Sequence, residues 1–205
     1  MKIKICGLNP TRDVQTCIDL NVHFLGFVFY DKSPRNTDLK EISVLKKYNP
    51  KTSHYVSVCV DPTDTFIQEN ILGNFEYIQL HGSEASERVK EIKNMGIKVI
   101  KAIKVKEQKD VALFKNYEDI ADLILFDSTS MEKSQNIPKE LLYKLPKGEK
   151  FGLAGAINLE NIQEYSQLGF NFLDLSSGLE RENLKGYKDH LKIKNFINKV
   201  NELKN

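Results

Sequence analysis

Short apolar runs alternate with longer amphipathic stretches along the whole chain. The apolar runs are rich in Val, Ile, Leu and Phe and have the length of strands, whereas the segments between them repeat apolar residues at helical spacing. The predicted strands span residues 2–6, 24–29, 54–60, 77–80, 98–103, 122–126, 151–154 and 172–175. The predicted helices span residues 11–20, 37–47, 64–72, 83–95, 108–117, 159–168 and 187–203.

This order predicts a single (β/α)8 TIM barrel, with one catalytic domain over residues 1–205. A strand followed by a helix, repeated about every 25 residues, requires crossover connections and a parallel sheet, and eight such units close a barrel. A doubly wound open sheet is the alternative, but it usually has a glycine-rich first turn, and the GxGxxG pattern is absent here. No linker or low-complexity tract divides the chain.

Composition and charge exclude several classes of protein. The chain is 40% hydrophobic and 28% charged, which suits one buried core. Lys and Arg number 30 against 28 Asp and Glu, too even a balance for a nucleic-acid binder. No apolar signal region or membrane-spanning run is present, so we expect a cytoplasmic protein. The three cysteines lack zinc or CxxC spacing, which predicts reduced thiols with neither a disulfide frame nor a structural metal.

Four predicted strands end in residues suited to chemistry. Cys6 closes the first apolar run and precedes Gly7, while His81, Asp127 and Asp174 lie at the ends of three later runs. Alternate residues share one face of a strand, so each of these four occupies the last or nearly last inward position. The ends of barrel strands meet at one mouth, which predicts a shared site.

Each residue also has a purely structural interpretation. A cysteine in an apolar segment is commonly a small buried hydrophobe, as we interpret Cys17 and Cys59. His81 could cap the following helix, and Asp127 could cap the loop after its strand. A carboxylate at the end of an apolar run is costly to bury without a task, which favours function for Asp127 and Asp174.

Two further features predict binding of an anionic ligand. Arg35 lies in a proline-stiffened loop after the second strand, which favours a clamp on a ligand carboxylate over an ordinary surface charge. Small-residue turns follow the seventh and eighth strands at Gly155–Ala156 and Ser177–Gly178. Backbone N–H groups in these two positions often hold phosphate in barrel enzymes. We therefore expect a small phosphorylated substrate, with no nucleic-acid or membrane partner.

Taken together, eight motifs resemble the phosphoribosylanthranilate isomerase family of tryptophan biosynthesis. The resemblance keeps motif order from residue 2 to about residue 196. The motifs are KICGL, GFVFYDKSPR, VSVCVD, IQLHGSE, LFDS, LAGAINLEN, DLSSGLE and KGYKDHLKI. The resemblance implies a (β/α)8 barrel without metal or organic cofactor. It also implies an acid–base Amadori rearrangement of N-(5-phosphoribosyl)anthranilate to 1-(2-carboxyphenylamino)-1-deoxy-D-ribulose 5-phosphate.

The resemblance also implies roles for the site residues. Asp127 is expected to act as general acid on the furanose ring oxygen, and Cys6 as general base at C2 of the sugar. Arg35 is expected to pair with the anthranilate carboxylate, while His81 and Asp174 line the substrate. The phosphate is assigned to the backbone at Gly155, Ala156, Ser177 and Gly178. Lys4, on the face of Cys6, is a source of the charge that would favour a thiolate. The oligomer is expected to be a monomer or a homodimer.

The chain departs from the family pattern in two places. A GGTG loop usually follows the sixth strand, but residues 128–138 contain no glycine. Lys133, Ser134, Gln135 and Asn136 offer side-chain donors, which predicts a side-chain-based lid; a solvated connector is the alternative. The second departure is Ala156, where the family usually has a second glycine, and this alanine disfavours a positive φ.

Two other functions remain open from the sequence. Another phosphosugar isomerase or epimerase would keep the phosphate turns without needing Cys6 or Arg35. A non-catalytic phosphate-binding barrel would have lost turnover together with the glycine loop. The presence of both Cys6 and Asp127 argues against this second alternative.

Overall fold

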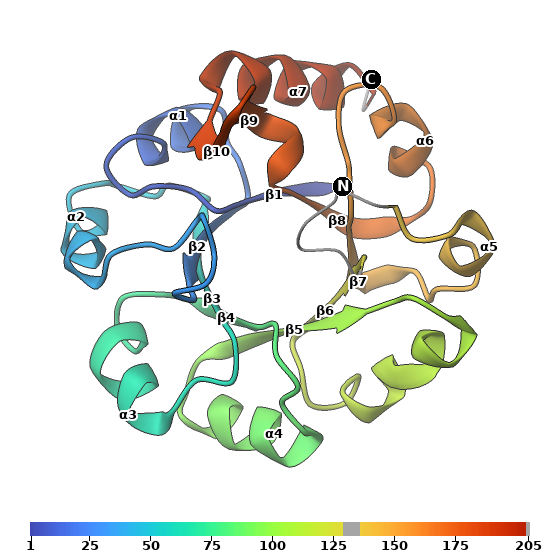
Figure 1. The fold of residues 1–205 in the computed structure, drawn as a ribbon, viewed down its shortest axis with the longest axis horizontal. Coiled ribbons are helices and arrows are strands. Elements are labelled where there is room, and N and C mark those ends of the chain that lie inside the picture. The colour runs from blue at the N-terminus through green and yellow to red at the C-terminus, as the bar shows by residue number, and fades with distance from the viewer. Residues whose placement is uncertain (129–135, 204–205) are drawn as a thin grey trace.

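Eight parallel strands close into a barrel in which neighbours in the chain are neighbours in the sheet, from β1 round to β8. The structure, a computed structural model, describes residues 1–128 and 136–203. Figure 1 shows the strands forming a ring in the centre, with the helices arranged around it. The predicted (β/α)8 barrel is therefore confirmed.

The strands agree closely with the apolar runs of the sequence. Their bounds are β1 Lys2–Cys6, β2 Phe24–Phe29, β3 His54–Cys59, β4 Tyr77–Leu80, β5 Lys98–Lys104, β6 Leu123–Asp127, β7 Gly148–Ala154 and β8 Phe170–Leu175. The first two and β4 begin and end where predicted. Strands β7 and β8 begin earlier than predicted, because Gly148 pairs with Phe170 beyond an irregularity in the register.

The connecting helices are shorter than their amphipathic patterns. The α-helices are α1 Val14–Asp19, α2 Ile42–Leu45, α3 Asp64–Phe66, α4 Ser86–Asn94, α5 Lys139–Leu142, α6 Ile162–Ser166 and α7 His190–Glu202. Single 3₁₀ or π turns complete several connections, at η1 Leu39–Glu41, η2 Ile67–Ile71 and η4 Ser177–Leu179. A 3₁₀ helix of nine residues, η3 Gln108–Asn116, lies between β5 and β6. Helix α5 was not predicted. In the described part of the chain, no helix is both long and apolar enough to cross a bilayer.

Apolar side chains fill two separate regions. The larger lies between strands and helices and takes the outward residues of each strand, such as Ile3 and Ile5 of β1. The smaller lies inside the barrel and includes Phe24, Leu125 and Phe172 from β2, β6 and β8. Strand alternation thus sends every second residue into the barrel, where the site residues lie above this inner core.

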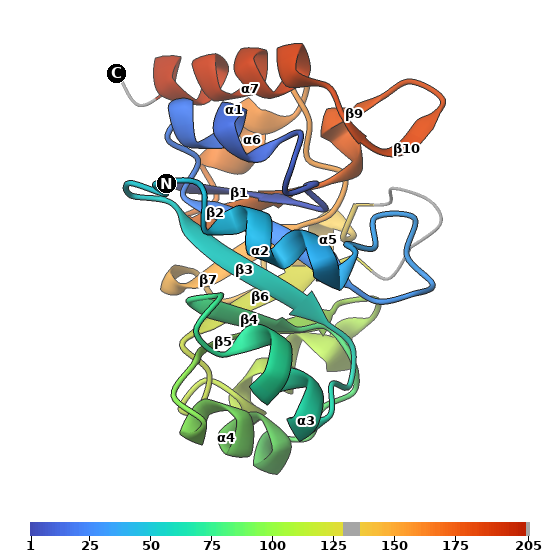
Figure 2. The same cartoon turned by 90° about the vertical axis from the view of Figure 1, so that its left-hand side faces the viewer.

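A β-hairpin that the sequence did not reveal lies between β8 and α7. It consists of β9 Glu180–Arg181 and β10 Leu184–Lys188, which pair antiparallel. The prediction of a helix from residue 187 was wrong at its start, because Asp189 caps the helix by accepting hydrogen bonds from the N–H groups of Leu191 and Lys192. Figure 2 shows the hairpin projecting on the same side as the loop after β2.

Replacement of Gly152 by alanine tests the packing inside the barrel. An added methyl group at Gly152 would overlap the ring of Phe172, which is fully buried. We expect Gly152→Ala to lower the free energy of unfolding by about 1–3 kcal/mol, measured by urea denaturation. The double variant Gly152→Ala with Phe172→Leu should recover part of the loss. Equal stability of Gly152→Ala and the wild type would show that Phe172 does not fill this space.

Candidate active site

Cys6 lies at the barrel mouth beside a buried ion pair. Lys4 and Asp174 are opposite each other in the register of β1 and β8, and Lys4 Nζ is 2.9 Å from Asp174 Oδ2. Gly26 of β2 pairs with Cys6, and a methyl group built on it would lie 3.1 Å from Lys4 Nζ and 3.2 Å from Cys6 Sγ. The absence of a side chain at Gly26 therefore leaves room for the ammonium group and the thiol to meet.

Burial and the nearby charges shift the pKa of the Cys6 thiol in opposite directions. Burial raises the pKa of the Cys6 thiol, and the nearby ammonium groups of Lys4 and Lys188 offset only part of that effect. Burial alone would lower the pKa of Lys4, but Asp174 and Cys6 outweigh it and hold this pKa above its ordinary value. The expected push of Cys6 toward thiolate is present but is smaller than the cost of burial. Lys4 itself stays charged.

Asp127 and His81 form a second pair at the mouth. Asp127 is the last residue of β6, His81 follows β4 directly, and His81 Nε2 lies 3.1 Å from Asp127 Oδ2. Both side chains are about one-fifth exposed, at 20% and 21%, so a ligand can reach them. Burial raises the pKa of Asp174 against the opposing effect of Lys4, and the charges of Asp127 and His81 also contribute, which places the pair near the Lys4–Asp174 ion pair. The four strand ends therefore converge as predicted.

The capping interpretation of His81 does not hold. Helix α4 begins at Ser86 with Ala85 as its N-cap, whereas the backbone N–H of His81 donates to the carbonyl of Cys59. The side chain of His81 pairs with Asp127 instead. The residues that Asp127 could cap after its strand include 129–135, which lie outside the described residues, so that interpretation stays a prediction.

Arg35 is already paired in the structure. Its Nε lies 2.5 Å from Glu180 Oε1 and its Nη2 lies 3.0 Å from Glu180 Oε2, a bidentate contact with the first residue of the hairpin. Its side chain is 19% exposed. The interpretation as an ordinary surface charge is wrong, while its contact with a ligand carboxylate stays a prediction.

The two predicted phosphate turns lie against each other. A methyl group on Gly178 would be 2.5 Å from the carbonyl oxygen of Ile157, so the turn after β8 packs closely on the turn after β7. Ala156 adopts a φ of +45°, a conformation that favours glycine, and its carbonyl accepts a hydrogen bond from Asn161 Nδ2 at 2.9 Å. The alanine therefore adopts the positive φ that its side chain was expected to disfavour.

Asp174 was predicted as a site residue, whereas Gln79, Glu180 and Lys188 were not identified from the sequence. Gln79 Oε1 and Asp174 Oδ1 are buried at the mouth without a hydrogen-bond partner among the described residues, and both are acceptors suited to ligand hydroxyl groups. Glu180 and Lys188 are also buried. Gln79 shares a strand face with the predicted site residue His81, and this alternation could have identified it. No sequence pattern marked Glu180 or Lys188. The proposed lid residues Lys133, Ser134 and Gln135 lie outside the described residues.

Comparisons with known proteins decide the family. Residues 3–199 match the model described as N-(5'phosphoribosyl)anthranilate (PRA) isomerase. The N-(5'-phosphoribosyl)anthranilate isomerase of Aquifex aeolicus is 34% identical over 98% of both chains, and that of Agrobacterium fabrum is 31% identical over 98% of this chain and 94% of its own. The chain belongs to this isomerase family.

Solved structures of the family agree with that result. The crystal structure of the isomerase from Thermotoga maritima has a TM-score of 0.86 at 27% identity, covering 98% of this chain and 99% of the other. A family structure in complex with reduced 1-(o-carboxyphenylamino)-1-deoxyribulose 5-phosphate has a TM-score of 0.82 at the same identity and coverage. The predicted family, fold and enzyme class are confirmed, and the two alternative functions are not favoured. Residues 1–128 and 136–203 contain no cluster of three His, Cys, Asp or Glu side chains able to hold a metal ion.

Alkylation of the native isomerase tests the environment of its thiols. Cys6 is 9% exposed, compared with 0% for Cys17 and 1% for Cys59, so iodoacetamide should modify Cys6 first. Because burial outweighs the nearby cations, the rate at Cys6 should rise with pH through a midpoint above the ordinary thiol pKa. Burial also raises the pKa of Cys59 to about 12.

Mass spectrometry after quenching at a series of pH values measures all three rates together. Protein unfolded in urea is the control, in which the cysteines should react alike with an ordinary midpoint. A native midpoint for Cys6 below the ordinary value would mean that Lys4 and Lys188 outweigh burial.

Proposed function

We propose that this chain converts N-(5-phosphoribosyl)anthranilate to 1-(2-carboxyphenylamino)-1-deoxy-D-ribulose 5-phosphate in tryptophan biosynthesis. The observation that supports it best is the position of a thiol and a carboxyl group, Cys6 and Asp127, at one barrel mouth in a member of this isomerase family. The reaction is an internal rearrangement, so atoms and electrons balance without any co-reactant. We also propose a cytoplasmic location, and a monomer or homodimer as the working form.

In the first step, protonated Asp127 donates its proton to the furanose ring oxygen. The bond from that oxygen to C1 breaks, and the lone pair of the anilino nitrogen forms a Schiff base with C1. His81 is within hydrogen-bonding distance of Asp127, so the two side chains can hold the acidic proton between them before transfer. In this assignment His81 orients the acid and also lines the substrate.

In the second step, the thiolate of Cys6 removes the proton from C2. The electrons of that C–H bond form a C1–C2 double bond, and the pair of the C–N double bond returns to nitrogen, which gives an enolamine. Loss of the hydroxyl proton and protonation of C1 then yield the ketone. Lys4 and Lys188 favour the thiolate that this step needs. Because the pKa of Cys6 is raised, the thiolate is a stronger base than that of an ordinary cysteine.

The remaining residues bind and orient the substrate. Arg35 binds the anthranilate carboxylate, and the backbone at Gly155, Ala156, Ser177 and Gly178 holds the phosphate. Asp174 Oδ1 and Gln79 Oε1 accept hydrogen bonds from sugar hydroxyl groups, which supplies the partners that these buried oxygens lack among the described residues.

The direct test is the loss of phosphoribosylanthranilate fluorescence on addition of purified protein. A control without enzyme corrects for spontaneous decay of the substrate. We expect decay that is proportional to protein concentration and a product identified by mass as an isomer of the substrate. A rate equal to that of the control would contradict the proposed function.

Removal of the proposed base should abolish turnover while the fold is kept. We expect Cys6→Ala to lower kcat by at least about a hundredfold, because a positioned general base is lost. Cys17→Ala is the matched control, since Cys17 lies in the outer core and should change only stability. Turnover by Cys6→Ala at the wild-type rate would overturn the role of Cys6.

Steady-state kinetics should separate binding from chemistry. We expect Arg35→Ala chiefly to raise KM, because a charge-assisted pair with the carboxylate is lost. Asp127→Asn should chiefly lower kcat, because an amide cannot donate an acidic proton. The opposite pattern would reverse the two assignments.

A further inference from the structure

The β9–β10 hairpin packs on the loop that carries Arg35. Gly186 of β10 has a φ of +81°, and a methyl group there would overlap the carbonyl oxygen of Pro34. Tyr187 lies under the guanidinium group of Arg12, 4.0 Å from ring centre to Cζ, which ties the hairpin to the segment after β1. The hairpin therefore touches the segments after both β1 and β2.

Within the hairpin, Glu180 connects two cations. It accepts the bidentate contact from Arg35, and its Oε1 also lies 3.3 Å from Lys188 Nζ. Burial alone would raise the pKa of Glu180, but Arg35 and Lys188 outweigh it and hold the pKa below its ordinary value. Glu180 is thus a buried, ionised carboxylate with cations on both oxygens.

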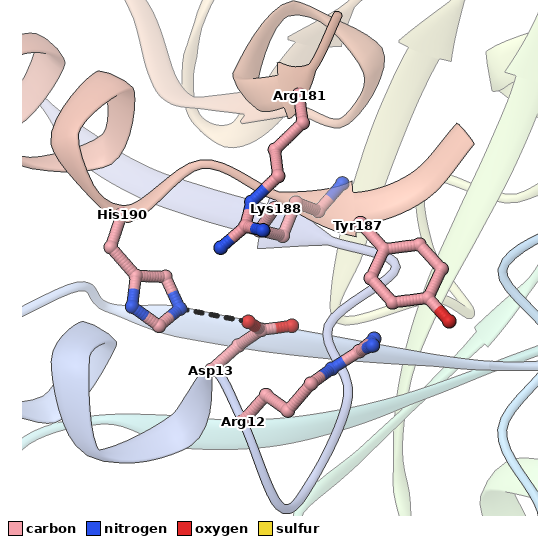
Figure 3. Close-up of a pocket in the computed structure, with 6 residues that line it drawn as sticks. All are labelled: Arg12, Asp13, Arg181, Tyr187, Lys188 and His190. Atoms are coloured by element: carbon pink, nitrogen blue, oxygen red, sulfur yellow. Dashed lines mark hydrogen bonds and ion pairs between the residues drawn. The ribbon is translucent and has the colours of Figure 1, made fainter. Parts of the chain in front are cut away.

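Lys188 links the Glu180 carboxylate to the strand end that carries Cys6. Its Nζ donates to the carbonyl of Ser176 at 3.0 Å, and Ser176 Oγ donates to the carbonyl of Cys6 at 3.1 Å. Lys188 lines a cavity of about 370 Å³. Figure 3 shows its amino group turned away from Arg12 and Asp13. The hydrogen bonds explain that direction, because the ammonium group is used inside the fold.

The contact with Glu180 uses one edge of the Arg35 guanidinium. Nε and one hydrogen of Nη2 are occupied, while Nη1 and the second hydrogen of Nη2 have no carboxylate partner in residues 1–128 and 136–203. These remaining donors form the end of the guanidinium fork, which can bind a second carboxylate in bidentate fashion. A guanidinium fixed along one edge presents the other in a single orientation, so less entropy is lost on binding.

We propose that Glu180 is a positioning residue that fixes Arg35 for recognition of the substrate carboxylate, and that Lys188 holds Glu180 in place. The inference rests on the proposed function, in which Arg35 binds the anthranilate carboxylate. Selectivity for a carboxylated aromatic amine then depends on a hairpin residue that does not touch the substrate itself.

Binding of two product analogues tests this role. One is reduced 1-(o-carboxyphenylamino)-1-deoxyribulose 5-phosphate, and the other is its phenylamino counterpart without the carboxylate. Calorimetry gives both Kd values for the wild type, for Glu180→Gln and for Glu182→Gln. The last is a matched control, because Glu182 is an exposed acid in the same hairpin.

We expect the wild type to prefer the carboxylated analogue and Glu180→Gln to lose about tenfold of that preference, the size of one charge-assisted contact. The Kd of the uncarboxylated analogue for Glu180→Gln should stay within about twofold of the wild-type value, because the substitution lies away from the contacts of that analogue. Glu182→Gln should keep the wild-type preference. In kinetics, Glu180→Gln should raise KM about tenfold and leave kcat within about threefold, since the contact serves binding and not chemistry.

The outcomes separate this inference from the proposed function. Full preference in Glu180→Gln overturns the inference alone, and so does a loss of stability and kcat with unchanged preference, which would mean a purely structural role. A wild type without preference overturns the role of Arg35 and this inference with it. If Glu180→Gln does not fold, Glu180→Asp takes its place, because it keeps the charge but shortens the side chain. Full preference of Glu180→Asp for the carboxylated analogue then overturns the inference.

Discussion

The buried ion pair between Lys4 and Asp174 is the interaction on which the barrel mouth depends. Burying two charges costs several kcal/mol for each ion unless they are paired at good geometry, and here the 2.9 Å contact supplies that geometry. The pair joins β1 to β8, where the closed sheet must meet itself. It also sets the charge around Cys6, because Lys4 counteracts the effect of burial on the thiol.

The same arrangement recurs in three side-chain pairs around the mouth. Lys4 and Asp174 are 170 residues apart, Arg35 and Glu180 are 145 apart, and His81 and Asp127 are 46 apart. Asp174, Arg35, His81 and Asp127 are thus each held by a partner from a distant part of the chain. Such pairing restricts the motion of long side chains, which favours a preorganised site over one that forms only on binding.

Strand alternation made much of the fold and half of the site predictable. A β-strand places every second residue inward, and parallel strands in a barrel end at one mouth, so the positions of Cys6, His81, Asp127 and Asp174 follow from local sequence. The pKa of Cys6 did not follow, because it depends on how deeply the finished barrel buries the thiol. The hairpin was missed since Glu180 and Gly186 are stabilised by contacts with the loop of Arg35, which no periodicity records.

A crystal structure of this protein with reduced 1-(o-carboxyphenylamino)-1-deoxyribulose 5-phosphate would test most directly whether the four strand ends serve one ligand. The account predicts the phosphate at the turns after β7 and β8 and the carboxylate on the outer edge of Arg35. It also predicts Cys6 Sγ about 3–3.5 Å from C2, with Asp127 on the side of the ring oxygen. A ligand bound with Cys6 and Asp127 both out of reach of the sugar would contradict the account.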